Sequence, residues 1–272
     1  MVLVYLIVFK LELTDLTSIA PVLPPKLLLY ILKSKNYGVE YQPIVALDTL
    51  EVFAYEALSR FYDDKNNPIA PDQVYKALHH NPLSLFQVEY AHKKLQLQHA
   101  PKNFKLFVNL DQDSYFAYGD DIAEQSITAK ELNPFIQLFL AHKDNEVIVE
   151  LIENSEIIDA KMSLNMIKLM ASYNIRTAID DVCNEQSMLS TAVLEQVNFI
   201  KFDRFVVLNK HNAKFLLLIR ALIAYAKAAG KKTILEGVET DDDLAFAKAL
   251  SIDYVQGFLF KPQFISMRSV GP

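Results

Sequence analysis

Carboxylate, amide and lysine side chains recur along this chain, and each lies within or just after a short apolar segment. They are Glu56, Asn109, Glu150, Asp180, Asp181, Lys201, Glu236 and Gln256. Carboxylate and amide oxygens are ligands that Mg²⁺ and Mn²⁺ prefer, and a set without His suits these ions better than Zn²⁺. Two such ions held side by side activate water and stabilise the leaving oxygen of a phosphate ester. The residue types therefore predict a two-metal site that acts on a phosphate ester.

The apolar segments that precede these residues have the length and composition of buried strands. Val147-Ile148-Val149 precedes Glu150, and Thr233-Ile234-Leu235 precedes Glu236. Longer segments with helical periodicity, such as 213–229, separate the strands. Strands that alternate with helices form a parallel sheet, and in a closed barrel the carboxyl ends of the strands meet at one rim. The alternation therefore predicts that the polar residues converge.

The first two strands, 41–47 and 51–58, differ from the rest because only a short turn at Asp48-Thr49 joins them. So short a connection allows an antiparallel hairpin but no parallel crossover. The segment 254–260 reads as the last strand. We predict an α/β fold, namely a TIM-like (β/α)8 barrel with one antiparallel strand at its start.

Carboxylates crowded at one rim need compensating charge. Burying a bare carboxylate costs several kcal/mol unless it is paired or binds a metal. Several acids at neighbouring strand ends would repel one another without cations, so their number argues for bound metal ions. Lys201 lies among them in sequence order and could orient or help activate a water molecule.

Composition limits the classes of function. The chain has 272 residues, of which 51% are hydrophobic, so it can bury a large core, and its net charge is −6. Proteins that bind duplex nucleic acid usually carry a basic patch, and no dense Lys or Arg cluster appears here. A single cysteine, Cys183, excludes an intramolecular disulfide and a cysteine-based zinc cluster. A small anionic substrate remains compatible with this charge if metal ions offset the acids.

Seven short motifs, taken in order, resemble the EAL family of cyclic di-GMP phosphodiesterases. They lie at 41–45, 56–60, 107–110, 150–153, 201–203, 236–240 and 256–260, and the resemblance covers most of the chain, from about Tyr41 to Pro262. Each motif is weak alone, but together they are specific. The resemblance implies hydrolysis of one phosphodiester of cyclic di-GMP to linear pGpG, with two Mg²⁺ or Mn²⁺ ions as cofactors and with Ca²⁺ as an inhibitor. It also implies a homodimer and a cytoplasmic location.

The resemblance assigns roles to individual positions. The implied metal ligands are Glu56, Asn109, Glu150, Asp180 and Asp181. The implied catalytic residues are Glu56, Asp181, Lys201 and Glu236, with Lys201 beside the reacting water. The implied substrate contacts are Gln42, Leu58, Arg60, Asp203, Gln256 and Pro262. Arg60 suits a phosphate because its planar fork matches two phosphate oxygens. Glu153 and Glu239 are implied to support the metal ligands from behind.

One loop departs from the family pattern. After the Asp-Asp pair the family usually has Phe-Gly-Thr-Gly, whereas this chain reads Val182-Cys183-Asn184-Glu185-Gln186. Both glycine positions are replaced, and glycine permits backbone conformations that other residues resist. We therefore expect weakened or regulated catalysis. Two alternatives stay open: a receptor that binds cyclic di-GMP with little or no turnover, and a protein-interaction module with a vestigial site.

The division of the chain is predicted from the same pattern. Residues 1–36 form an N-terminal extension, 37–265 the barrel domain and 266–272 a C-terminal tail. The apolar segment 1–9 is too short to span a bilayer, which takes about 20 residues, and reads as a strand or as a remnant of a preceding region. A longer parent protein could add a sensory or GGDEF-type domain, or a tether to the inner membrane.

Overall fold

The structure, a computed structural model, describes residues 23–117, 132–152 and 157–268. The strands are β1 (Tyr37–Ala46), β2 (Val52–Tyr62), β3 (Pro68–Ile69), β4 (Lys105–Asn109), β5 (Glu146–Ile152), β6 (Arg176–Val182), β7 (Phe199–Phe202), β8 (Lys232–Leu235), β9 (Tyr254–Val255) and β10 (Ile265–Arg268). The helices are α1 (Pro25–Ser34), α2 (Pro71–Leu78), α3 (Pro82–Gln98), α4 (Gln112–Phe116), α5 (Pro134–Ala141), α6 (Ile157–Ser172), α7 (Thr191–Gln196), α8 (Phe205–Leu208), α9 (Ala213–Ala228) and α10 (Asp241–Leu250).

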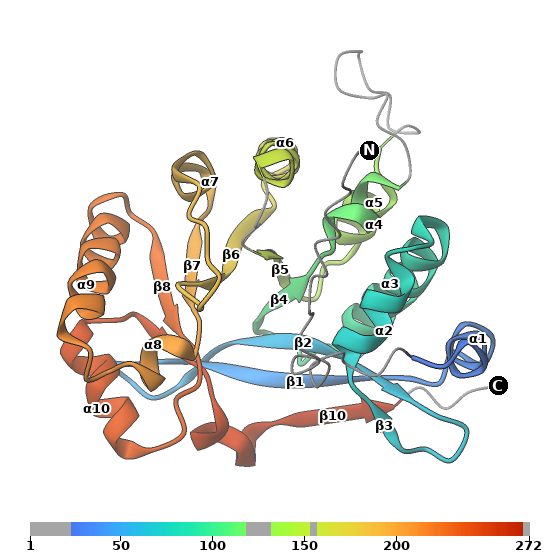
Figure 1. Ribbon diagram of the computed structural model, residues 1–272, viewed down its shortest axis with the longest axis horizontal. Helices are drawn as coiled ribbons and strands as arrows, with labels where there is room; N and C mark the ends of the chain where they lie inside the picture. Colours follow the sequence, from blue (N-terminus) through green and yellow to red (C-terminus); the bar gives the residue numbers. More distant parts are fainter. Residues whose placement is uncertain (1–22, 118–131, 153–156, 269–272) are drawn as a thin grey trace, which may run out of the picture.

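Eight strands close into a barrel. β1 pairs with β2 on one side and with β9 on the other, and the ring continues through β4, β5, β6, β7 and β8. β1 is antiparallel to both neighbours, while the successive pairs from β2 to β9 are parallel. Helices lie around the outside of the strands (Figure 1). The predicted TIM-like barrel with one antiparallel strand at its start is confirmed.

An apolar layer fills the barrel interior. It consists of Ile44, Ala54, Phe107, Ile148, Ala178, Phe199 and Ile234, one residue from each of seven strands. Side chains on a strand alternate between its two faces, so the residue two positions along shares the interior face. On the parallel strands that next residue is a candidate site residue, as Glu150 is for Ile148 and Lys201 is for Phe199. The layer therefore fills the barrel interior beneath the strand ends with apolar side chains.

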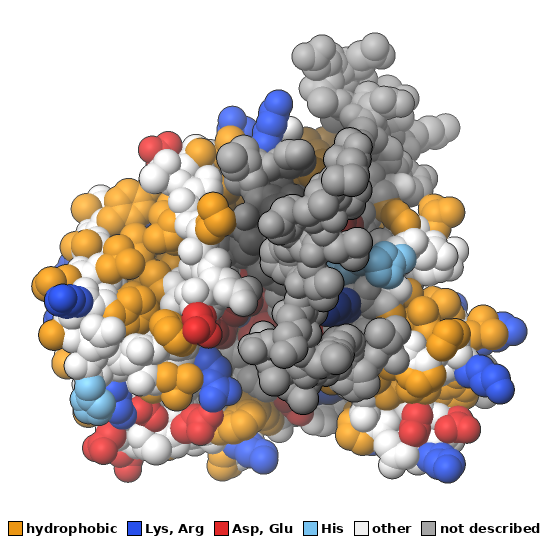
Figure 2. Space-filling view, viewed as in Figure 1, with side chains coloured by type: hydrophobic (Ala, Val, Ile, Leu, Met, Phe, Trp, Pro, Cys, Tyr) orange, Lys and Arg blue, Asp and Glu red, His pale blue; other side chains and the backbone are white. Residues whose placement is uncertain are grey.

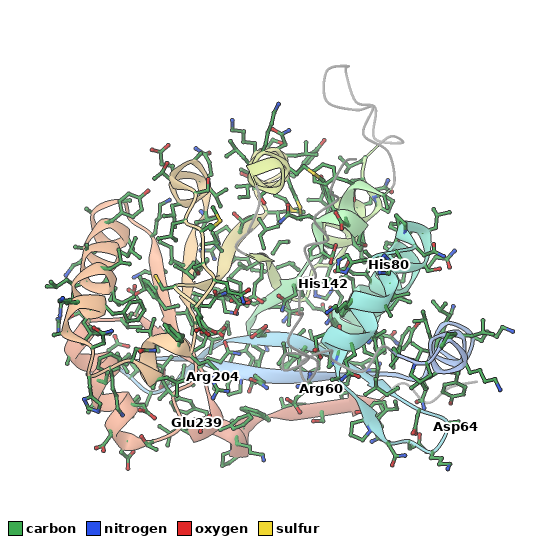
Figure 3. All side chains as sticks on the ribbon, in the orientation of Figure 1. Arg60, Asp64, His80, His142, Arg204 and Glu239 are labelled. Atoms are coloured by element: carbon green, nitrogen blue, oxygen red, sulfur yellow. The ribbon has the colours of Figure 1, made fainter. Side chains whose placement is uncertain are left out.

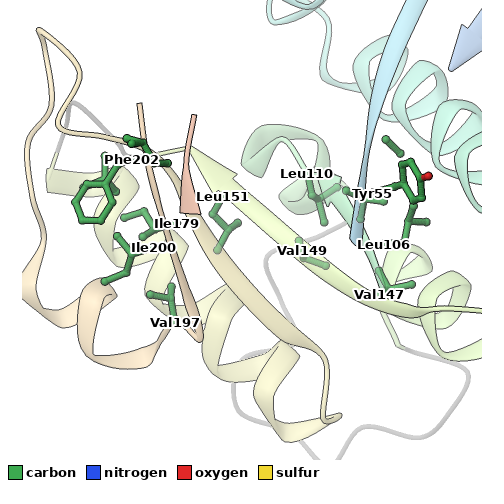
Figure 4. Close-up of a cluster of buried hydrophobic side chains, with 14 of the residues drawn as sticks. Tyr55, Leu106, Leu110, Val147, Val149, Leu151, Ile179, Val197, Ile200 and Phe202 are labelled. Carbon is green, nitrogen blue, oxygen red and sulfur yellow. The ribbon is translucent and has the colours of Figure 1, made fainter. Parts of the chain in front are cut away.

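The opposite face of each strand packs against the helices. Figure 4 shows part of this cluster, in which Val149, Leu151, Ile179 and Ile200 point away from the barrel axis and toward the helical layer. The strands are thus apolar on both faces below the rim, which is why they appear as continuous hydrophobic segments in the sequence. Polar residues at their ends stand out against this background.

The apolar segment Leu27–Leu32 lies within α1. Its Ile31 is buried in a second apolar cluster with Phe61, Val74 and Leu78, so α1 packs on the barrel beside α2 and α3. β10 pairs antiparallel with β1 and extends the sheet beyond the closed ring. On the face shown in Figure 2, hydrophobic side chains gather over α9. None of the described helices is long and apolar enough to cross a membrane.

One predicted element is wrong in part. The segment 254–260 is a strand only at Tyr254–Val255, and a 3-10 helix, η1 (Phe258–Gln263), follows. The chain turns at Gly257, where a Cβ atom would lie 2.2 Å from the carbonyl oxygen of Val238. This close approach of two backbone segments ends the strand. The apolar segment 1–9 lies outside the described residues, and the proposed division of the chain stays a prediction.

Candidate functional site

The Lys201 side chain on β7 is fully buried among carboxylates from other strands. Its Nζ lies 2.6 Å from Glu150 Oε1, 2.7 Å from Glu236 Oε1, 3.0 Å from Asp180 Oδ1 and 3.5 Å from Glu56 Oε2. These residues come from β2, β5, β6 and the position just after β8. The structure therefore brings together acids that lie up to 180 positions apart in the sequence.

Glu56 is held by two amide side chains. Asn109 Nδ2, at the end of β4, donates to Glu56 Oε1 over 2.8 Å. Gln256 Nε2, just after β9, donates to Glu56 Oε2 over 2.6 Å. Both oxygens of this carboxylate thus have fixed partners, and the predicted ligands Glu56 and Asn109 lie in direct contact.

Burial and charge act against each other in this cluster. Burial would raise the pKa of Glu56, but the Lys201 ammonium and the hydrogen bond from Gln256 outweigh it and hold that pKa below its usual value. Burial would lower the pKa of Lys201, yet Asp180, Glu150, Glu236 and Glu56 together raise it well above its usual value. Lys201 is therefore a permanent cation, and Glu56 is ionised.

The remaining acids carry more negative charge than Lys201 can compensate. Burial and the charge of Glu56 raise the pKa of Glu150 well above its usual value, and burial also raises that of Asp180. Burial and the Asp180 charge raise the pKa of Asp181 to about 7. Burial raises the pKa of Glu236 to about 8, because the neighbouring acids oppose the favourable effect of Lys201. The site therefore takes up protons unless another cation is present.

The carboxylates form two groups with the spacing of metal ligands. Oxygens of Glu56, Glu150 and Asp180 lie within 4.8 Å of one another, and so do oxygens of Asp180, Asp181 and Glu236. Asp180 belongs to both groups, so it lies between two candidate cation positions. A buried side-chain oxygen of Glu150, Oε2, has no hydrogen-bond partner within the described chain. Oxygen-rich groups with excess negative charge fit divalent cations.

A row of polar residues continues from this cluster along the β1–β2 pair. The antiparallel register places Gln42 opposite Glu56 and Glu40 opposite Leu58, with Arg60 two positions further along β2. Opposed residues of an antiparallel pair share one face, so all five point to the side that carries Glu56. Glu40 accepts hydrogen bonds from Gln42 Nε2 over 2.9 Å and from Arg60 Nη2 over 2.6 Å.

Glu40 is not among the site residues predicted from the sequence. Its position two residues before Gln42 on the same strand could have identified it, because strand side chains alternate with a period of two. The two-residue spacing between Glu40 and Gln42 indicates a shared site only once the register between β1 and β2 is known. Arg60, labelled in Figure 3, also donates from Nη1 to the carbonyl oxygen of Ser59 over 2.9 Å.

Other predicted site residues lie outside the tight cluster. Asp203 follows β7, and its Oδ1 accepts the Phe205 N–H at the start of α8 over 2.7 Å, while its charge also raises the pKa of Asp181. Pro262 is exposed within η1. Glu239 is exposed, and its backbone N–H donates to Asp243. Glu153 lies outside the described residues.

The altered loop after β6 keeps an unusual backbone. Cys183, which stands at the first replaced glycine position, has φ = 65° and is buried, whereas Glu185 at the second is exposed. Ser187 closes the loop because its Oγ donates to the Asp181 carbonyl over 3.1 Å and accepts the Asn184 N–H over 3.0 Å. This chain thus forms a left-handed turn here without glycine.

A cavity of about 450 Å³ opens beside the cluster. Residues 57–60 of β2 and residues 109–111, where β4 ends, line one side of it, and α2 and α3 line the other. Leu58, Arg60 and Asn109 face this space, so predicted metal and substrate contacts share one opening. The dimensions are those of ordinary small-molecule sites.

Comparison with known proteins agrees with this geometry. The EAL domain family matches residues 27–263. The cyclic di-GMP phosphodiesterase NbdA of Pseudomonas aeruginosa is 24% identical over 234 residues, which are 84% of this chain and 29% of the relative. The cyclic di-GMP phosphodiesterase PdeA of Borreliella burgdorferi is 24% identical over 247 residues, which are 88% of this chain and 36% of the relative.

Solved structures show the same fold. The Bacillus subtilis YkuI protein, which has an EAL domain and was solved in complex with substrate c-di-GMP and calcium, has a TM-score of 0.69 at 20% identity, over 85% of this chain and 57% of that chain. The chain spans about a third of the length of the curated relatives it matches. Since the family match covers most of the sequence and the barrel carries the motifs at its strand ends, the chain belongs to the EAL domain family.

Proposed function

We propose that this chain is a metal-dependent phosphodiesterase that hydrolyses cyclic di-GMP to linear pGpG. One observation carries the proposal: two clusters of three carboxylates, which share Asp180, lie around the buried Lys201. The related phosphodiesterases and the c-di-GMP complex of YkuI point to the same substrate. The chain supplies each residue type that this reaction needs.

The donor set fits two divalent cations. Glu56, Asn109, Glu150 and Asp180 would hold the first ion, and Asp180 and Asp181 the second, with Glu236 in reach of the second group. Mg²⁺ or Mn²⁺ suits these oxygen ligands, and bound ions would activate water and neutralise the charge that develops on the phosphodiester. Ca²⁺ takes longer bonds and more ligands, so we expect it to support binding and to inhibit turnover.

The protein side chains would position the substrate and the reacting water, and one of them would accept a proton. The Lys201 ammonium, which lies among these carboxylates, can donate hydrogen bonds to a reacting oxygen. Glu236 is the partly exposed carboxylate beside Lys201, so in its ionised form it would be placed to accept a proton from water. Gln42, Leu58, Arg60, Asp203, Gln256 and Pro262 would contact the dinucleotide, and Glu153 and Glu239 would support the ligands.

Hydrolysis of cyclic di-GMP tests the proposal. Purified protein is incubated with cyclic di-GMP and Mg²⁺ or Mn²⁺, and pGpG is measured by chromatography. We expect turnover that Glu56→Gln abolishes and that Glu51→Gln preserves, because Glu51 is an exposed acid in the hairpin at the opposite end of β2. Absence of pGpG with every divalent ion would refute the enzyme.

A receptor is the second candidate, and the loop 182–186 favours it. Cys183 and Glu185 stand where the family has glycine. Cys183 holds a conformation that costs a non-glycine residue about 1–2 kcal/mol. Binding of cyclic di-GMP in Ca²⁺ without turnover in Mg²⁺ or Mn²⁺ would identify a receptor. Absence of both binding and turnover would leave a protein-interaction module.

Assembly and location follow from the proposed function. We expect a homodimer, which sedimentation of the purified chain can test. Cyclic di-GMP is an intracellular nucleotide, so we expect a cytoplasmic site, with a sensory or GGDEF-type domain or an inner-membrane tether in a longer parent protein. The chain spans only about a third of the length of these curated relatives, so the dimer, the added domain and the tether are proposals for the whole protein.

A further inference from the structure

Glu40 places a carboxylate in the row of residues proposed to bind an anionic substrate. Its register partner on β2 is Leu58, and its neighbours on the same face are Gln42 and Arg60. Each of those neighbours is a proposed contact to cyclic di-GMP, whereas a second carboxylate beside a phosphate would repel it. The position of Glu40 therefore needs an explanation other than direct binding.

The contacts of Glu40 involve both neighbours. Its Oε1 accepts from Gln42 Nε2 over 2.9 Å and from Arg60 Nη2 over 2.6 Å, and its Oε2 lies 3.5 Å from Ser266 Oγ on β10. The Arg60 and Glu40 side chains are 28% and 23% exposed, so solvent and ligand can reach the pair. One acid thus occupies the donors of two proposed substrate residues.

Arg60 has five N–H donors, and its hydrogen bonds already engage one on Nη2 and one on Nη1. Its Nη2 is engaged by Glu40, and its Nη1 donates to the Ser59 carbonyl. The paired donation that makes arginine a good phosphate partner uses two N–H groups of one fork. A phosphate that took a fork including the Nη2 N–H bonded to Glu40 would have to displace the Glu40 oxygen or accept a weakened contact.

We propose that Glu40 competes with the substrate phosphate for Arg60 and thereby sets the affinity of the site for cyclic di-GMP. This inference rests on the proposed function. In the ligand-free chain the Glu40 carboxylate takes the place of a phosphate oxygen on the guanidinium, and it holds Gln42 at the same time. Binding exchanges one anionic partner for another, so the net gain from Arg60 is smaller than it would be without Glu40.

A purely structural role for Glu40 makes a different prediction. If the acid only fixed the orientation of Arg60 and Gln42, its loss would weaken binding, because both side chains would become mobile. Ser266 is too distant for a strong hydrogen bond, so the link from Glu40 to β10 contributes little. The sign of the change in affinity therefore separates competition from orientation.

Glu40→Gln is the informative substitution. The side-chain carbonyl of the introduced glutamine can still accept from Gln42, while the negative charge is removed. We expect cyclic di-GMP to bind about two to five times more tightly in Ca²⁺, measured by calorimetry, because exposed ion pairs of this kind contribute up to about that factor. If turnover occurs, KM should fall with kcat unchanged. Glu51→Gln, which removes the same charge from the far end of β2, should change neither.

Arg60 must mediate the gain. In an Arg60→Ala background, Glu40→Gln should give no tighter binding, whereas a general charge effect would persist. Equal or weaker binding by Glu40→Gln, or a gain that survives Arg60→Ala, would overturn the proposal.

A second arm separates this inference from the proposed function. Inorganic phosphate is titrated into the native chain and Glu40→Gln while the Arg60 side-chain N–H signal, assigned by its loss in Arg60→Lys, is followed by NMR. If neither the native chain nor Glu40→Gln binds cyclic di-GMP, the proposed function fails. A shift of the Arg60 signal at lower phosphate concentration in Glu40→Gln than in the native chain would still support competition at Arg60. An identical response in both proteins would overturn it.

Discussion

At the scale of single residues, the Lys201 ammonium decides how so many acids can share one pocket. It is fully buried and contacts carboxylates from four other positions of the barrel rim. Its raised pKa means that the charge persists at any physiological pH. In the metal-free chain the Lys201 ammonium stabilises the surrounding carboxylates. It leaves an excess of negative charge that divalent ions can neutralise.

Replacement of Lys201 should therefore reduce stability strongly. Lys201→Met leaves Glu56, Glu150 and Asp180 buried without their cation, and breaking a buried ion pair in this way costs about 3–5 kcal/mol. Urea unfolding in EDTA at pH 8 measures the change. Lys232→Met on β8 is the matched control, because Lys232 pairs with Asp253 at the surface and such pairs contribute about 0–1 kcal/mol. Equal losses in the two variants would contradict this account.

The sequence predicted most of the cluster because carboxylates stand out after apolar strands. Glu56, Asn109, Glu150, Asp180 and Lys201 all meet at the rim. Glu40 was missed because its role depends on the register between β1 and β2, which no local pattern reports.

At the scale of elements, short segments after the strands fix the site residues. Gln256 N donates to the Leu235 carbonyl, and Val238 N donates to the Gln256 carbonyl, so the segments that carry Glu236 and Gln256 are tied together. Gly257 permits this, because a Cβ there would lie 2.5 Å from Val238 N and 2.2 Å from its carbonyl oxygen. The 3-10 helix η1 starts directly afterwards. The sequence predicted a longer strand here because close packing of two backbones leaves no periodic signal.

Gly257→Ala should push these segments apart. We expect a loss of about 1–3 kcal/mol, as for other overpacked sites, together with a weaker Gln256–Glu56 contact. Gly230→Ala is the control: its φ is also positive, at 68°, but nothing lies within 4 Å of the added Cβ. Guanidinium unfolding of both variants measures the difference. If Gly257→Ala lost no more stability than Gly230→Ala, close packing would not be the cause.

The loop after β6 gives a second prediction at this scale. Cys183→Gly and Cys183→Ala both remove the thiol, but only glycine adopts φ = 65° without strain. We expect the glycine variant to be more stable than the alanine variant by about 1 kcal/mol, measured by urea unfolding. At Arg220, an exposed position in the interior of α9, the order should reverse, because alanine favours a helix over glycine by about 1 kcal/mol. The same order at both sites would show that Cys183 is unstrained.

At the scale of the whole molecule, closure of the barrel converts a linear series of residues into a site. The sequence predicted the alternation of strands and helices and the antiparallel start, because apolar periodicity and a short turn report them directly. It could not report that β1 also pairs with β9, which requires contacts between the two ends of the ring. Closure places Gln256 against Glu56, 200 positions apart, above an apolar floor.

The electrostatic state of this closed site should appear in the stability of the entire protein. In the metal-free chain the pKa of Asp181 is raised to about 7 and that of Glu236 to about 8. Between the usual carboxylate range and these values, the folded chain holds protons that the unfolded chain has released. Stability therefore falls as pH rises through this window.

Calorimetric melting in EDTA from pH 5 to pH 9 measures this fall. Mg²⁺ or Mn²⁺ binds the ionised carboxylates, so the stabilisation by metal should grow with pH, reaching about 2.7 kcal/mol when the free ion is a hundred times its Kd. The double variant Asp181→Asn, Glu236→Gln removes two of the titrating groups and should make the fall in the EDTA profile smaller across the same range. A metal-free melting temperature that rises from pH 5 to pH 8 in the native chain but not in this variant would contradict the assigned pKa shifts. A metal effect of equal size at pH 5 and pH 8 would show that protons and cations do not compete for the same oxygens.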